Sequence, residues 1–244
     1  MKHWLLFLGI ASTMAHADQI SVLSGGAAKS FIEPLAKTFP GHTVKLEFQP
    51  MGKLTKSLAD GYPADMVVVT SEVLDQLKND PQLNLKAAKP IARVGIGVAV
   101  HESAAIPDIR TVDAFRKTLL AAKSVVYIDP KVGTSGRHVA EILQRLGIAE
   151  QVNAKAKLGA GGYITEPVGR GEIELGIHQI SEILPVKGVK LAGPLPAELQ
   201  KYTVYVAVPV AASGKASVVG QFISHLTNTQ ARERLAQAGY TSPE

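Results

Sequence analysis

The 244-residue chain has no cysteine, few aromatic residues and no block of like charges. Without cysteine it forms neither disulfides nor thiolate metal sites. Its formal net charge of +5 is modest, and the lack of basic runs with interleaved aromatics argues against a nucleic-acid surface. The mild basic excess instead favours a small anionic ligand.

Only one long apolar stretch is present, and it lies at the start of the chain. Lys2 gives a basic start, residues 4–11 are apolar, and Ala15-His16-Ala17 fits an A-x-A cleavage site. The stretch is too short to span a bilayer. We therefore predict a signal peptide over residues 1–17, cleavage after Ala17 and a mature protein in the periplasm.

The mature chain alternates strand and helix patterns, as an α/β protein does. Apolar or alternating runs predict strands at 19–23, 44–48, 66–70, 92–100, 124–128, 156–159, 175–179 and 202–208. Helices are predicted at 27–39, 53–60, 72–78, 112–122, 138–146, 164–170 and 217–239, the last split near Asn228. Ser24, Ser71 and Thr111 are the expected N-caps, and Pro34 predicts a kink or a late start in the first helix.

Small-residue loops follow three of these strands, and each leads into a helix. They are Ser24-Gly25-Gly26, Gly133-Thr134-Ser135-Gly136 and Gly161-Gly162. A helix that starts at the carboxyl end of a strand offers unpaired N–H groups to an anion. Two lobes facing each other would bring the three loops to one cleft, although a single doubly wound sheet fits the same pattern.

Several enzyme motifs are absent. The run Gly25–Ser30 lacks the glycine spacing of a phosphate-binding P-loop. The run Gly133–Gly136 lacks the order of a nucleophile elbow, and no histidine pair has metal-ligand spacing. We expect no metal and no cofactor.

The order of elements resembles the bacterial extracellular solute-binding proteins of the molybdate-binding type. The resemblance is carried by segments 20–26, 62–69, 132–136, 170–177 and 230–241. It implies a type 2 periplasmic-binding-protein fold with a ligand cleft between two α/β lobes, one of residues 18–91 and 209–244, the other of 92–208. It also implies a monomer that captures a small anion and presents it to an ABC-type membrane permease.

Two further features of the resemblance concern the ligand. The hydroxyl-bearing positions of molybdate binders correspond here to Ala27, Met51-Gly52 and Gln179, none of which carries a hydroxyl. Segments 175–182 and 194–198 look more like the aconitate isomerase branch of the superfamily. The resemblance therefore implies a di- or tricarboxylate ligand. As an alternative to simple capture, the resemblance implies the interconversion of cis- and trans-aconitate by an allylic proton shift.

The candidate site residues follow from these loops and from the needs of such a shift. An allylic proton shift requires a base and groups that stabilise the negative charge that develops. Glu182 and His178 are the catalytic candidates; Lys29 and Lys53 stay open as bases, with Glu166 a weaker one. The ligand-binding candidates are Ser24, Gly25, Gly26, Lys29, Met51, Gly52, Thr134, Ser135, Gly136, Arg137, Gly161, Gly162, Tyr163 and Gln179.

Overall fold

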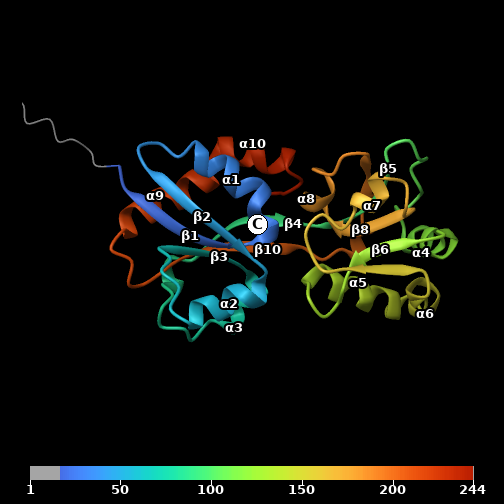
Figure 1. Ribbon diagram of the computed structural model, residues 1–244, viewed down its shortest axis with the longest axis horizontal. Helices are drawn as coiled ribbons and strands as arrows, with labels where there is room; N and C mark the ends of the chain where they lie inside the picture. The colour runs from blue at the N-terminus through green and yellow to red at the C-terminus, as the bar shows by residue number, and fades with distance from the viewer. Residues whose placement is uncertain (1–16, 244) are drawn as a thin grey trace, which may run out of the picture.

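The computed structural model describes residues 17–243 and has two lobes, each built on a five-stranded sheet (Figure 1). The two-lobed α/β fold is thus confirmed over the single-sheet alternative. The signal peptide lies outside the described residues except for Ala17, and it remains a prediction. No helix within residues 17–243 combines the length and apolar character needed to cross a membrane.

The first sheet has the strand order β2-β1-β3-β10-β4. Its strands are β1 (Gln19–Gly25), β2 (Thr43–Gln49), β3 (Met66–Thr70), β4 (Lys89–Val94) and β10 (Thr203–Pro209). The first three run parallel, whereas β10 pairs antiparallel with β3 and β4. Because parallel strands end at the same edge, the loops after β1, β2 and β3 gather at one side of this lobe.

Helices cover both faces of the first sheet (Figure 1). One face carries α1 (Lys29–Lys37), α9 (Ala216–Thr227) and α10 (Thr229–Gln237); the other carries α2 (Met51–Ala59) and α3 (Ser71–Gln76). Short 3-10 turns are η1 (Gly26–Ala28) and η2 (Leu85–Ala87). Met66 and Val68 pack on the first face, whereas Val67 and Val69 pack on the second. This double coverage explains the continuous apolar run of β3.

The second sheet repeats this plan with the order β7-β6-β8-β5-β9. Its strands are β5 (Ile96–His101), β6 (Val125–Ile128), β7 (Ala156–Gly159), β8 (Leu175–Gln179) and β9 (Val189–Pro194). Here β5 is antiparallel to β8 and β9, and β6 is parallel to β7 and β8. The helices are α4 (Val112–Ala121), α5 (Thr134–Arg145), α6 (Ala149–Asn153), α7 (Glu166–Gly169) and α8 (Ile180–Ile183), with η3 (Ala197–Leu199).

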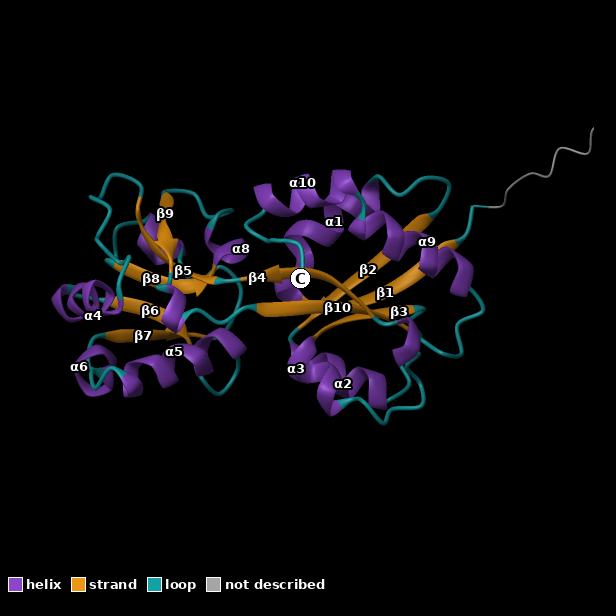
Figure 2. Ribbon diagram, turned by 180° about the vertical axis from the view of Figure 1, so that it is seen from behind, coloured by secondary structure: helices purple, strands orange, loops and turns teal. Residues whose placement is uncertain are grey.

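Two chain crossings join the lobes (Figure 2). Gly95 alone separates β4 from β5, and residues 195–202 lead from β9 back to β10. The Gln200 side chain accepts from the Ile96 N–H and donates to the Ile96 carbonyl, each at 2.8 Å. The side-chain amide of Gln200, in the second crossing, therefore links it to Ile96, just after the first.

The crossings explain where the sequence reading differs from the structure. The predicted strand 92–100 is two strands, because the chain changes sheets at Gly95. The predicted lobe boundaries at 91/92 and 208/209 fall inside β4 and β10, which both belong to the first sheet.

Some predicted helix ends also differ. Ser24 lies inside β1 rather than capping a helix. The N-cap of α3 is Thr70, not Ser71, and the Thr70 hydroxyl accepts from the Val73 N–H at 3.3 Å. Thr111 is confirmed as the N-cap of α4. The helix predicted from 138 begins four residues earlier, at Thr134, so that its first turn is made of the small-residue loop.

Candidate functional site

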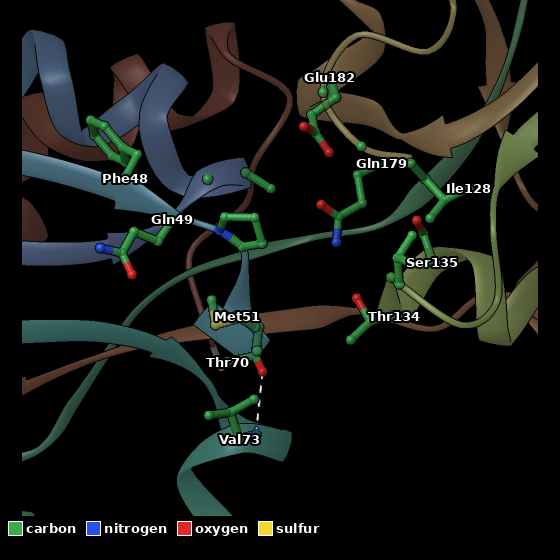
Figure 3. Close-up of a pocket in the computed structure, with 18 of the residues that line it drawn as sticks. Phe48, Gln49, Met51, Thr70, Val73, Ile128, Thr134, Ser135, Gln179 and Glu182 are labelled. Atoms are coloured by element: carbon green, nitrogen blue, oxygen red, sulfur yellow. Dashed lines mark hydrogen bonds between the residues drawn. The ribbon is translucent and has the colours of Figure 1, made fainter. Parts of the chain in front are cut away.

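A cleft of about 770 Å³ lies between the lobes. Figure 3 shows Gln49 and Met51 of the first lobe opposite Thr134, Ser135 and Gln179 of the second. The first lobe supplies Gly26, Ala27, Lys29, Ser30, Phe48, Gln49, Pro50, Met51, Gly52, Thr55, Thr70, Glu72, Val73, Gln76 and Tyr205. The second supplies Ile128, Lys131, Val132, Gly133, Thr134, Ser135, Arg137, Ala160, Gly161, Gly162, Tyr163, His178, Gln179, Ser181 and Glu182.

Two long helices begin at the cleft, one from each lobe. α2 starts directly after β2, with Pro50 as its N-cap, and α5 starts after β6, with Gly133 as its N-cap. Neither cap residue supplies a side-chain hydrogen bond to the first turn. The Lys53 N–H donates to the Pro50 carbonyl oxygen at 3.0 Å, and the other N–H groups of the two first turns stay available. The helix dipoles favour negative charge between the lobes.

Cationic side chains reach the cleft from both lobes. Lys29 comes from the start of α1, and its Nζ lies 5.8 Å from the centre of the Phe48 ring. Lys131 comes from the loop before α5. No carboxylate of residues 17–243 lies within ion-pair distance of either Nζ. An anionic ligand can therefore pair with both lysines without displacing an internal partner.

One ion pair spans the two lobes. The Arg137 Nη2 of α5 lies 3.5 Å from Glu72 Oε1 of α3, and both side chains are about half exposed. The cleft wall therefore carries an acidic side chain next to one of its cations.

A buried histidine–glutamate pair forms part of the second-lobe wall. His178 lies near the end of β8 and Glu182 lies in α8, four residues on. His178 Nε2 is 3.0 Å from Glu182 Oε2, and the two side chains are 3% and 15% exposed. Nε2 is also 3.1 Å from the Gly162 carbonyl oxygen. The pair is thus fixed at the cleft and shielded from bulk water.

Neutral polar groups complete the floor of the cleft. Gln179 donates from Nε2 to the Thr203 hydroxyl at 2.9 Å, and its Oε1 accepts from the Tyr205 hydroxyl at 3.4 Å. Burial, together with nearby Tyr240 and Glu182, raises the pKa of Tyr205 well above its usual range. The Tyr205 phenol therefore stays protonated, and its long bond to Gln179 leaves it able to donate to a ligand.

A second buried phenol supports the first-lobe wall. The Tyr240 hydroxyl donates to the Ala27 carbonyl and contacts the Ser30 hydroxyl at 2.9 Å. Burial raises the pKa of Tyr240 to about 12. It ties the C-terminal segment to η1 and α1, from which Lys29 and Ser30 reach the cleft.

The structure brings together residues of all three predicted loops at this cleft. Of the predicted site residues, those that line it are Gly26, Lys29, Met51, Gly52, Thr134, Ser135, Arg137, Gly161, Gly162, Tyr163, His178, Gln179 and Glu182. The open base candidate Lys53 and the weaker candidate Glu166 do not line it.

Three predicted site residues lie behind the lining instead. Ser24 is fully buried, and its hydroxyl donates to the Gly25 carbonyl. A Cβ at Gly25 would come 1.9 Å from the Met51 Cε, and one at Gly136 would come 2.2 Å from the Ile128 carbonyl oxygen. The two glycines therefore permit close packing under the site, which is a different reason for a glycine than contact with a ligand.

Several lining residues were missed by the sequence reading. Gln49 and Thr70 end β2 and β3, so their position at strand carboxyl ends was an available signal. Lys131 lies two residues before the predicted loop Gly133–Gly136 and could have been identified in the same way. Tyr205 lies inside β10, and nothing in its local sequence indicates that its hydroxyl reaches a cleft.

Metal binding has no support in the described part of the chain. No group of three or more histidine, aspartate or glutamate side chains there is placed to hold an ion. The hydrogen-bond donors of the cleft are N–H groups, hydroxyls and cations, which suit an anion. Its two carboxylates, Glu72 and Glu182, lie beside Arg137 and His178.

Comparison with known proteins agrees with this architecture. Residues 20–241 match the family of bacterial extracellular solute-binding proteins. The chain is 30% identical over 243 residues to an aconitate isomerase from a Pseudomonas species, with 94% of this chain and 92% of that protein covered. It is 26% identical over 260 residues to the molybdate-binding protein ModA of Escherichia coli (strain K12), with 98% of each covered.

A solved structure extends the match to the fold. The periplasmic molybdate-binding protein of Azotobacter vinelandii superposes with a TM-score of 0.74 at 18% identity, covering 92% of this chain and 100% of that one. The family match over residues 20–241 rests on sequence, and the superposition shows the same two-lobed fold. This chain belongs to the bacterial extracellular solute-binding protein family.

Proposed function

We propose that the cleft binds a small di- or tricarboxylate. The observation that carries the proposal is the pair of lysines, Lys29 and Lys131, which face one cleft from opposite lobes without internal ion-pair partners among residues 17–243. A ligand with carboxylates at both ends satisfies both lysines and the first turns of α2 and α5 at once.

The size and the apolar part of the lining support an organic ligand over a bare tetrahedral oxyanion. Phe48, Val73, Ile128 and Val132 line the cleft between its polar groups. A volume of about 770 Å³ lies within the range of sites that hold carbon-containing ligands. Molybdate would leave the apolar lining without a partner.

Titration of the purified mature chain tests this proposal. We expect citrate, cis-aconitate and trans-aconitate to bind, measured by isothermal titration calorimetry, and molybdate and sulfate to give no signal. Lys29→Ala and Lys131→Ala should each weaken the carboxylates by about 1–3 kcal/mol. Lys78→Ala and Lys117→Ala, one exposed lysine in each lobe away from the cleft, serve as controls. Binding of molybdate alone would overturn the proposal.

A second function, isomerisation of aconitate, is favoured by the buried His178–Glu182 pair at the cleft. A relative named aconitate isomerase matches 94% of the chain at 30% identity. In the reaction a base removes an allylic proton from the methylene carbon of aconitate. The double bond shifts by one carbon, and a proton returns at the other end of the allyl unit. The cations and N–H groups of the cleft stabilise the charge that develops on the carboxylate.

Following cis-aconitate by proton NMR separates capture from catalysis. Appearance of trans-aconitate at a rate proportional to protein concentration supports the isomerase. Tight binding of both isomers without conversion supports a capture protein that delivers the carboxylate to an ABC-type permease. In either case we propose export to the periplasm with cleavage after Ala17, and N-terminal sequencing of the exported protein tests that site.

A further inference from the structure

The proton of the His178 ring is placed by the Gly162 carbonyl. Nε2 lies 3.1 Å from this carbonyl oxygen in a hydrogen bond, and it also lies 3.0 Å from Glu182 Oε2. A carbonyl oxygen only accepts, so Nε2 must carry the hydrogen that is donated to Gly162. The short contact with Gly162 would be repulsive for the opposite tautomer.

The other ring nitrogen of His178 has no partner. Nδ1 is buried and makes no hydrogen bond with any residue of 17–243. With the proton on Nε2, the ring has its lone pair on Nδ1, an atom that is buried and therefore out of reach of a ligand in the cleft.

The two carboxylate oxygens of Glu182 have different surroundings. Its Oε2 is held by His178, whereas Oε1 has no hydrogen-bond partner among the described residues. The side chain is 15% exposed and lines the cleft, and Figure 3 shows its carboxylate directed into the space between the lobes. One oxygen is thus fixed and the other is free to meet a ligand.

We infer that Glu182 is the base that removes the allylic proton and that His178 is a positioning residue that never exchanges a proton with the ligand. This inference rests on the isomerase candidate above. Glu182 Oε1 takes the proton from the methylene carbon, and the electron pair of that C–H bond forms the new double bond. The former π pair then binds a proton at the far carbon of the allyl unit, and this proton comes from the Glu182 carboxyl group, so that Glu182 ends as the carboxylate it began as.

His178 also holds the loop that covers this side of the cleft. Gly161 and Gly162 both have positive φ, at 134° and 68°, and Tyr163 follows them at the cleft. The bond from Nε2 to the Gly162 carbonyl fixes this loop, and the same nitrogen lies 3.0 Å from Glu182 Oε2. A substitution that removes the N–H donor of residue 178 should disturb the loop and the Glu182 carboxylate. A side chain that places another N–H donor at the same position should preserve them.

Conservative variants separate the two roles. Glu182→Gln keeps the shape but cannot take a proton, so we expect isomerisation to fall by about 10²–10⁴-fold while calorimetry still detects aconitate binding. His178→Gln retains an N–H donor and should keep a measurable kcat, well above that of His178→Leu, with KM little changed. Glu166→Gln, an exposed carboxylate outside the cleft, is the matched control. His178→Gln as inactive as Glu182→Gln, or an active Glu182→Gln, would overturn the assignment.

The ring tautomer is measured independently of activity. In protein labelled with ¹⁵N-histidine, we expect the His178 signals, identified by their loss in His178→Gln, to show a protonated Nε2 and a bare Nδ1. A proton on Nδ1 contradicts the inference. Wild-type protein that does not isomerise aconitate overturns the isomerase candidate and the role of Glu182 as its base. The NMR result then still decides the charge and the tautomer of His178.

Discussion

Gly136 offers a test of how closely α5, whose first turn lines the cleft, packs against β6. It lies in the first turn of α5, packed against the end of β6. A Cβ there would lie 2.2 Å from the Ile128 carbonyl oxygen and 2.8 Å from its carbonyl carbon, where ordinary contact begins at 3.4 Å. Both neighbours are backbone atoms, so no side-chain rotation relieves the clash, and α5 must move by about 1 Å.

We therefore expect Gly136→Ala to lower the free energy of unfolding by about 1–3 kcal/mol, the usual cost of overpacking. The shift of Thr134 and Ser135 should weaken carboxylate binding by about tenfold or more, since displacements of about 1 Å are costly at a site. Urea unfolding and calorimetry measure the two effects.

Gly220→Ala provides the matched control for this substitution. Gly220 lies in α9 with open space around its Cβ position. Because alanine is the better helix former, this variant should gain about 0.5–1 kcal/mol and bind normally. A Gly136→Ala protein with wild-type stability and affinity would refute the reasoning.

Two further predictions follow from charges at and behind the cleft. Glu72→Gln should strengthen carboxylate binding about two- to fivefold, because it frees Arg137 and removes a charge of the same sign as the ligand; the effect is small because the ion pair is half exposed. Calorimetry that finds weaker binding would contradict this and would indicate that the ion pair holds the two lobes together. Burial raises the pKa of Tyr240 to about 12, against about 10 in the unfolded chain. The stability it confers is complete below about pH 10 and declines by about 3 kcal/mol up to about pH 12, because the unfolded state loses the proton first. Urea unfolding across this range should show a flatter decline for Tyr240→Phe, and parallel curves would contradict the assignment.

The sequence predicts those parts of the fold that local patterns determine. The uniform apolar run of β3 can be predicted because helices cover both faces of the sheet. Thr111 can be predicted as an N-cap because its hydroxyl accepts from the N–H of Ala114, three residues on. The change of sheet at Gly95 is not readable, since the apolar pattern continues through it from β4 into β5. Which glycines face a ligand and which permit packing depends on contacts such as that of Gly136 with Ile128.

The candidate site likewise has parts that the local sequence predicts and parts that depend on long-range contacts. Loops at strand ends predict the N–H donors, because helix starts follow strand ends in the sequence. The hydrogen bonds of the Tyr205 hydroxyl with Gln179 and of His178 Nε2 with the Gly162 carbonyl join residues that are distant in sequence. The contacts from which we propose Glu182 rather than His178 as the base are therefore not visible in the local sequence.

The His178–Glu182 pair and the two lysines are held by different parts of the fold. β8 lies between β6 and β5 in the middle of the second sheet, and Gln179 ends β8 and is also the N-cap of α8. No loop intervenes, so the pair is held by the centre of the sheet. The lysines, by contrast, come from a helix start in the first lobe and a loop in the second, so their separation depends on how the two lobes are placed. The position of the proposed base is therefore set within one sheet, whereas the proposed grip on the ligand's carboxylates is set by both lobes.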